Sequence, residues 1–136
     1  MYKRILIPVD ISHKERAQAM IQAADRLADD GAQITLYNVV EDVPSYITVQ
    51  TPETVLETAK TNASKELAAI ATQADIKAHV EVGRGRAHST ILDYADRIDA
   101  DLIVVASHKP GLQDFLLGST AARVVRHATC TVLIIR

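Results

Sequence analysis

The stretch Leu102-Ile103-Val104-Val105-Ala106 decides the fold, because an uninterrupted apolar run rich in β-branched residues suits a strand that is covered on both faces. Similar runs lie elsewhere in the chain, separated by longer stretches whose apolar residues recur at spacings of three and four, as in amphipathic helices. The predicted strands are Tyr2–Val9, Gln33–Val40, Lys77–Val82, Leu102–Ala106 and Thr131–Ile135. The predicted helices are Lys14–Asp29, Glu53–Gln73, Ala87–Ile98 and Ser119–His127.

Strands that alternate with helices in this way favour an α/β fold of the Rossmann-like kind, an open parallel five-stranded sheet with helices on both faces. Right-handed crossovers leave only a few topologies. The most apolar run, residues 102–106, is expected to lie centrally beside the first strand. This placement predicts the strand order 3-2-1-4-5.

Local signals predict where several elements begin and end. Ser12 is a candidate cap for the first helix, and Glu15 three residues later would complete a capping box. Gly31 suits a left-handed exit from the same helix. The turn Gly83-Arg84-Gly85 is expected to end the third strand.

Length, charge and composition limit the classes of function. The 136 residues fit one domain, 1–136. A formal net charge of −2 removes the main electrostatic argument for nucleic-acid binding. The single cysteine, Cys130, excludes an intrachain disulfide and a zinc site built on cysteines. No segment approaches the roughly eighteen apolar residues that cross a bilayer, so we expect a cytoplasmic protein with no nucleic-acid or membrane partner.

Sheets of this kind bind ligands beyond the carboxyl ends of their strands, where the chain reverses direction, here between strands 1 and 4. Asp10 follows Pro8 and Val9 at the end of strand 1, where its carboxylate could accept hydrogen bonds from a ribose or adenine, hold a metal, or simply cap a helix. The triplet Gly118-Ser119-Thr120 opens the last helix. Unpaired backbone N–H groups and the positive end of the helix dipole suit a phosphate there, and an ordinary helix cap is the alternative.

A third signal follows strand 4, where Ser107-His108-Lys109 offers a cation for a phosphate. A solvated loop explains each of these residues taken singly. The three signals nevertheless converge on one crevice, which favours a nucleotide or another phosphate-bearing ligand.

Missing motifs exclude several nucleotide-binding and catalytic classes. No GxGxxG follows the first strand and no GxxxxGK[ST] occurs, so neither a dinucleotide site nor a P-loop is expected. No GxSxG occurs, which argues against an α/β-hydrolase. A phospho-receiver domain is disfavoured because the third strand ends in Glu81-Val82-Gly83 without the required aspartate.

The whole chain resembles the universal stress protein family. Ile5-Leu6-Ile7-Pro8-Val9-Asp10 is similar to the family's opening strand. The most specific likeness is Leu116-Leu117-Gly118-Ser119, followed by Val125-Arg126-His127-Ala128 and the closing strand Val132-Leu133-Ile134-Ile135.

The resemblance implies a small homodimer that binds ATP in the crevice. Mg²⁺ could sit between the phosphate oxygens and Asp10, since it often needs few protein ligands. Carried over by position, the resemblance places Pro8, Val9 and Asp10 beside the adenosine and the backbone of Val39 against adenine. Gly118, Ser119 and Thr120 would bind phosphates. The family pairs its subunits through the final strand, here Thr131 to Ile135, which would also cover an apolar edge.

The chain departs from the family's G-x2-G-x9-G-[ST] loop at two glycines. Ala106 and Lys109 stand at those positions, and the loop is one residue shorter. The Ser-His-Lys-Pro sequence resembles a subgroup of small bacterial members, so we expect Ala106, Ser107, His108 and Lys109 to line the phosphate end of the site. Lys109 would supply charge that the glycine form lacks.

The predicted function is an ATP-binding stress-response module whose nucleotide state alters a surface that faces an unidentified protein partner. No catalytic residue and no metal-ligand set is predicted, so any ATP hydrolysis is expected to be slow. Two alternatives stay open: a nucleotide-free dimeric interaction protein of the same family, and a slow ATPase.

Overall fold

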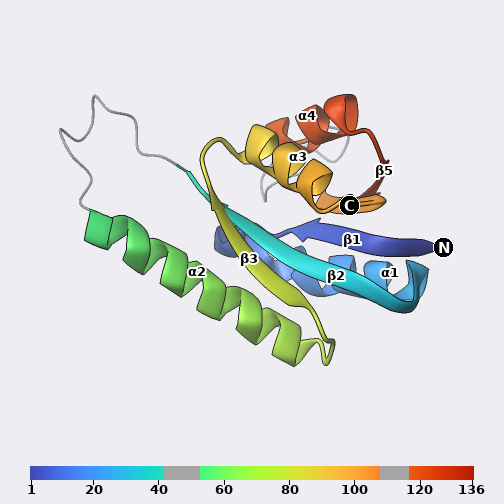
Figure 1. Cartoon of the computed structure of the whole chain (residues 1–136), viewed down its shortest axis with the longest axis horizontal. Coiled ribbons are helices and arrows are strands. Elements are labelled where there is room, and N and C mark those ends of the chain that lie inside the picture. The colour runs from blue at the N-terminus through green and yellow to red at the C-terminus, as the bar shows by residue number, and fades with distance from the viewer. Residues whose placement is uncertain (42–52, 108–116) are drawn as a thin grey trace.

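Parallel strands and α-helices alternate along the chain in the computed structural model, which describes residues 1–41, 53–107 and 117–136 (Figure 1). The strands are β1 (Tyr2–Pro8), β2 (Ala28–Val40), β3 (His79–Arg84), β4 (Leu102–Ala106) and β5 (Thr131–Ile135). The helices are α1 (Ala17–Leu27), α2 (Glu53–Gln73), α3 (Ala87–Arg97) and α4 (Ser119–His127), with a 3₁₀ helix η1 (Ile11–Arg16) before α1. The strand order β3-β2-β1-β4-β5, parallel throughout, confirms the predicted topology.

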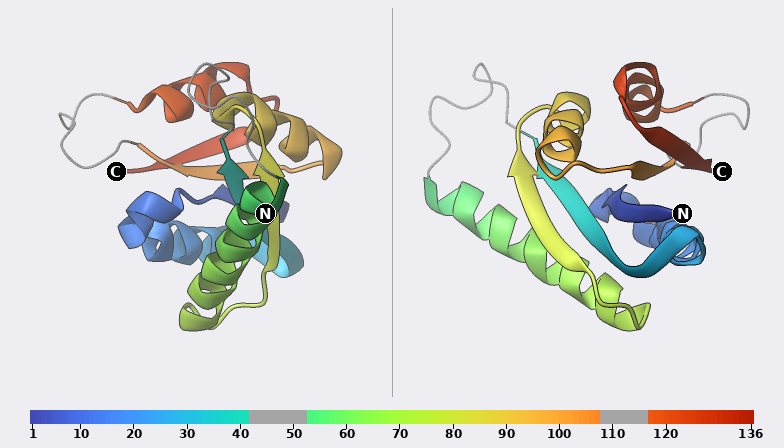
Figure 2. Two further views of the ribbon diagram at one scale, coloured as in Figure 1. Left: turned by 90° about the vertical axis from the view of Figure 1, so that its left-hand side faces the viewer. Right: turned by 45° about the vertical axis from the view of Figure 1, so that its right-hand side comes forward.

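Helices cover both faces of the sheet, α1 and α2 on one side and α3 and α4 on the other (Figure 2). Alternate residues of a strand point to opposite faces, so β4 sends Leu102 and Val104 into one core and Ile103 and Val105 into the other. All four side chains are buried. The expectation that residues 102–106 form a central strand covered on both faces is therefore confirmed.

The entry to the first helix differs from the prediction. Asp10, not Ser12, is the cap, because the Asp10 side chain accepts a hydrogen bond from the backbone N–H of Ser12 (3.0 Å) at the start of η1. The regular α-helix begins only at Ala17 and ends at Leu27, two residues earlier than expected. Ala28 is already extended and pairs with Tyr2 in β1, which explains the earlier end.

The third strand also runs differently from the prediction. Gly83 does not end it, because Gly83 pairs with Val39 and the next residue, Arg84, pairs with Val40. The strand ends before Gly85, whose φ of +136° is a conformation that glycine adopts more readily than other residues. Gly83 instead leaves room for the Tyr37 ring, which stacks on Tyr94 with 4.3 Å between ring centroids.

Asp101 joins the starts of β1 and β4. Its carboxylate accepts the backbone N–H groups of Lys3 (2.8 Å) and Arg4 (2.9 Å), and its own N–H donates to the carbonyl of Arg4 (2.9 Å). This carboxylate satisfies two donors at the beginning of a strand that is central to the sheet.

We expect Asp101→Ala to lower the free energy of unfolding by about 2 kcal/mol, because two backbone N–H groups lose a charged acceptor. Urea denaturation followed by circular dichroism measures the change. Asp93→Ala, on the exposed side of α3, is the matched control and should stay within about 0.5 kcal/mol of the parent. An unchanged urea midpoint for Asp101→Ala would mean that the carboxylate does not hold the two strands together.

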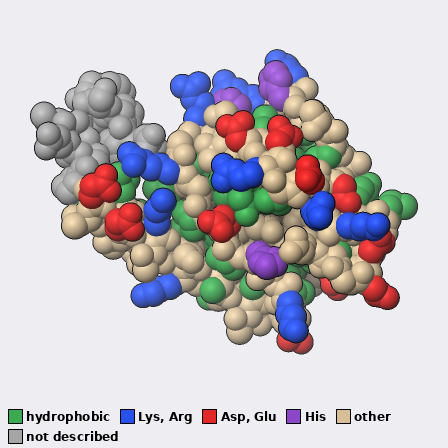
Figure 3. All heavy atoms as spheres, in the orientation of Figure 1, with side chains coloured by type: hydrophobic (Ala, Val, Ile, Leu, Met, Phe, Trp, Pro, Cys, Tyr) green, Lys and Arg blue, Asp and Glu red, His purple; other side chains and the backbone are tan. Residues whose placement is uncertain are grey.

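Surface charge is unevenly distributed. Figure 3 shows red and blue side chains mixed over much of the molecule, with blue and purple side chains gathered along its upper rim. Figure 1 places α3 and α4 at that rim. The sequence is consistent with this basic rim, because Ser119–Arg136 contains three arginines and no Asp or Glu.

Candidate functional site

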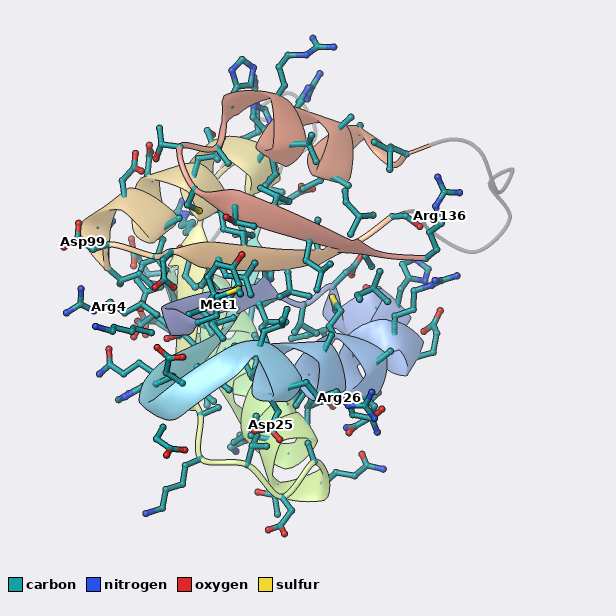
Figure 4. All side chains as sticks on the ribbon, turned by 90° about the vertical axis from the view of Figure 1, so that its right-hand side faces the viewer. Met1, Arg4, Asp25, Arg26, Asp99 and Arg136 are labelled. Atoms are coloured by element: carbon teal, nitrogen blue, oxygen red, sulfur yellow. The ribbon has the colours of Figure 1, made fainter. Side chains whose placement is uncertain are left out.

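The site predicted from the sequence lies at the carboxyl edge of the sheet, which is the side where the C-terminal ends of the parallel strands lie. Ile5 and Leu6 of β1 pair with Leu102 and Ile103 of β4, so the two central strands run side by side to that edge. Figure 4 shows Arg4 and Asp99 at one edge of the sheet and Arg136, which follows β5, at the opposite edge. The ends of β1 and β4 and the start of α4 therefore belong to the same end of the molecule.

The exit of β1 is held firmly against β2. Val9 is buried, and its N–H donates to the carbonyl of Tyr37 (2.8 Å). The carbonyl of Val9 in turn accepts the Asn38 side-chain amide (2.8 Å). Asp10, which comes next, is exposed. Asp10 accepts a hydrogen bond from the N–H of Ser12, so capping of η1 is one of its roles. The same bond fixes the direction of the carboxylate.

Ser107 connects the end of the sheet to the start of the last helix. Ala106 pairs with Ile135, and the N–H of Ser107 donates to the carbonyl of Ile135 (2.9 Å). The carbonyl of Ser107 accepts the N–H of Gly118 (2.5 Å). Ser107 is almost completely buried. These bonds hold the beginning of α4 directly beyond the carboxyl end of β4.

The start of α4 has the properties of an anion site. Gly118 is the cap residue, and no side chain caps the helix there. The first turn of α4 contains no acidic residue, whereas Arg126 and His127 lie in the last turn. The first N–H groups of a helix have no partner within it, so backbone donors and the positive end of the dipole meet no opposing charge from this turn.

Side-chain hydroxyls add to these donors. Ser119 is exposed and Thr120 is half-buried at the first two positions of α4. The φ of Gly118 is −63°, which any residue adopts, so the backbone conformation does not require glycine at this position. The lack of a side chain at Gly118 keeps the backbone open to close approach by a ligand.

Most of the predicted site residues fall at this one edge. Pro8, Val9 and Asp10 lie at the end of β1, Ala106 and Ser107 at the end of β4, and Gly118, Ser119 and Thr120 at the start of α4. Val39 lies near the end of β2 and packs with the core on the α3 and α4 side. His108 and Lys109 lie outside the described residues, so their predicted roles stay predictions.

Sequence reasoning missed a group of arginine and histidine side chains near this edge. The pKa of His88, in the first turn of α3, is lowered by partial desolvation and by the nearby charges of Arg123, Arg86 and His127. These residues come from two segments more than thirty positions apart in the chain. The absence of acidic residues from α4 was the only signal in the sequence that pointed to them.

Two other kinds of function receive no support from the described part of the chain. Among residues 1–41, 53–107 and 117–136, no group of three His, Cys, Asp or Glu side chains is arranged to hold a metal ion. No helix within those ranges is long and apolar enough to cross a membrane.

Comparison with known proteins finds one family. A family model described as the universal stress protein family matches residues 1–136. Universal stress protein G of Salmonella typhimurium is 32% identical over 149 aligned residues, which cover all of both chains. Among solved structures, the universal stress protein UspA of Lactobacillus plantarum is 31% identical, with a TM-score of 0.75 over 99% of this chain and 98% of that one. A universal stress protein of Archaeoglobus fulgidus in complex with dAMP is 25% identical, with a TM-score of 0.60 over 99% and 98% of the two chains.

Proposed function

Because this chain belongs to the universal stress protein family, we propose that it binds an adenine nucleotide, and specifically ATP, at the carboxyl edge of its sheet. Bound nucleotide would change a surface to which a protein partner binds during a cytoplasmic stress response. The chain is then a regulatory binding module, not primarily a catalyst.

The start of α4 is the observation that carries this proposal. Backbone N–H groups and the positive end of the helix dipole lie there, Ser119 and Thr120 occupy the first two helical positions, and no acidic residue is present in the first turn. An anion is the ligand that such an arrangement favours, and the phosphate of a nucleotide is one that helix N-termini bind.

The order of the strands indicates where the nucleoside part of the nucleotide would lie. A phosphate at the start of α4 leaves the nucleoside near the ends of β1 and β2. There Val39 offers backbone and apolar surface, and Asp10, which follows the buried Val9, offers a carboxylate for sugar hydroxyls. His108 and Lys109 would approach the phosphates from the chain between β4 and α4. The dAMP complex of the Archaeoglobus relative supports an adenine nucleotide in this family, and the choice of ATP for this chain rests on the predicted phosphate contacts.

Mg²⁺ would accompany the phosphates with few protein ligands, as it often does in nucleotide sites. Asp10 is the carboxylate that could share it, although its side chain already accepts the N–H of Ser12. An ion held this way would neutralise phosphate charge. No catalytic residue is assigned, so any hydrolysis should be slow.

We further propose that two copies pair through the outer edge of β5, which contacts only β4 among the described strands. The N–H of Ser107 bonds to the carbonyl of Ile135, so Ile135 faces β4. Backbone groups alternate in direction along a strand, and those of Val132 and Ile134 therefore point outward and are free to pair with a second copy.

Val132→Pro should convert the dimer to a monomer, because proline removes one outward N–H while leaving the bonds to β4 in place. Light scattering after size-exclusion chromatography measures the mass, and Val132→Thr is the control that keeps the N–H. A parent protein that is already monomeric at micromolar concentration would rule out this pairing.

Isothermal titration calorimetry with ATP, AMP and GTP tests the proposed function itself. We expect saturable binding of ATP and AMP at one site for each chain, and much weaker binding of GTP. Mass spectrometry of ligand released gently from the purified protein provides a second readout. If no adenine nucleotide binds and none is released, the alternative of a nucleotide-free interaction protein replaces this proposal.

A further inference from the structure

Two arginines and two histidines form a cluster across α3 and α4, here called the α3–α4 cluster: Arg86, His88, Arg123 and His127. Arg86 caps the start of α3 and His88 lies in its first turn, whereas Arg123 and His127 lie on α4. Desolvation, followed by the nearby charges of Arg123, Arg86 and His127, lowers the pKa of His88, in agreement with this arrangement. The two helices pack against each other, and blue and purple side chains gather over them in Figure 3.

No carboxylate balances this cluster within the described ranges. None of the ion pairs there involves any of its four members. Arg86 is the cap residue of α3 but makes no capping bond through its side chain, and the first turns of both helices lack acidic residues. Like charges gathered without a counter-charge disfavour one another, so an anionic ligand would relieve their repulsion.

The cluster lies beside the proposed nucleotide site. The N–H of Gly85, directly before Arg86, donates to the carbonyl of Val40 (3.1 Å) and so holds the entry to α3 at the end of β2, next to Val39. On α4, Arg123 comes four residues after Ser119 and shares its face of the helix. Helical side chains lean toward the N-terminus, which directs Arg123 toward the phosphates expected at Ser119 and Thr120.

We propose that Arg86, His88 and Arg123 hold the phosphate groups beyond the α-phosphate, so that this chain distinguishes nucleoside triphosphates from monophosphates. This inference rests on the proposed nucleotide site. Guanidinium groups suit the task because they donate two parallel hydrogen bonds to a phosphate. The amides of α4 would hold the first phosphate in every adenine nucleotide, and the cluster would add affinity only when a second and third phosphate are present.

Calorimetry with ATP and AMP on Arg123→Gln and Arg86→Gln tests the inference. Each variant should weaken ATP binding about tenfold, the size of one lost charge-assisted contact, while AMP affinity stays within about twofold. Arg126→Gln is the matched control, because Arg126 is on the same helix and its loss changes the net charge equally, yet it is not among the charges acting on His88. Both affinities should be unchanged in this control.

Two results would overturn the inference while leaving the nucleotide site intact. One is an equal loss of ATP and AMP affinity in Arg123→Gln, which would mean that the arginine supports the site as a whole. The other is an ATP loss in Arg126→Gln as large as in Arg123→Gln, which would reflect general electrostatic attraction. A parent chain that binds neither nucleotide would instead refute the proposed function, and the inference with it. Circular dichroism confirms the fold of each variant.

Discussion

Ser119→Asp should abolish nucleotide binding while leaving the fold at least as stable as the parent. A carboxylate in the first helical turn interacts favourably with the dipole, by about 0.5 kcal/mol. The same carboxylate repels phosphate from the N–H groups that are proposed to bind it, and we expect ATP affinity to fall at least about a hundredfold. Calorimetry measures affinity, and urea denaturation measures stability.

Ser119→Asn is the matched control, because it is similar in size to aspartate, carries no charge and is also tolerated at helix starts. It should keep ATP affinity within about tenfold of the parent. The pair separates electrostatic exclusion of the ligand from damage to the helix. Undiminished ATP binding by a folded Ser119→Asp variant would mean that phosphate does not bind at the start of α4.

Gly83→Ala should destabilise the fold by about 3 kcal/mol, at the upper end of the cost of overpacking. A Cβ at this position would overlap Oη of Tyr37, and it would lie 2.7 Å from Cζ of the same ring and 3.0 Å from Cγ2 of Thr90. The Tyr37 ring cannot easily move, because it is 3% exposed and stacked on Tyr94 at an interplanar angle of 1°. Thermal and urea denaturation measure the loss.

Two further variants identify the cause. Gly31→Ala meets no atom within 4 Å and bears only the strain of a φ of +77°, so it should cost roughly 1 kcal/mol. Tyr37→Phe in the Gly83→Ala background removes the nearest clashing atom and should recover part of the lost stability, a coupling that a double-mutant cycle reports. If Gly83→Ala unfolds at the parent's urea midpoint, the close packing of Gly83 and Tyr37 is wrong.

The fold could be predicted because its main signals are local. The apolar run of β4 and the spacing of apolar residues in α1 and α3 need no knowledge of distant contacts, and strand order follows from the rules of parallel sheets. The error at Gly83 occurred where a distant contact decides. Gly83 looked like a strand breaker, but pairing with Val39 and packing of Tyr37 explain its place inside β3.

The location of the candidate site could also be predicted from local signals. The positions of Asp10 and Gly118 follow from strand and helix ends, and their meeting at one edge follows from the topology. Whether Asp10 caps or binds could not be read from the sequence, because both roles use the same carboxylate. The α3–α4 cluster was missed because the packing of two helices that are distant in sequence brings it together.

Amide chemical shifts of Ser119 and Thr120 during an ATP titration test the central claim most directly. Two-dimensional ¹H–¹⁵N spectra of the labelled protein should show both resonances moving saturably with ATP, and hardly at all with adenosine, which lacks phosphate. Resonances that stay in place at saturating ATP, or that move equally with adenosine, would contradict phosphate binding at the start of α4.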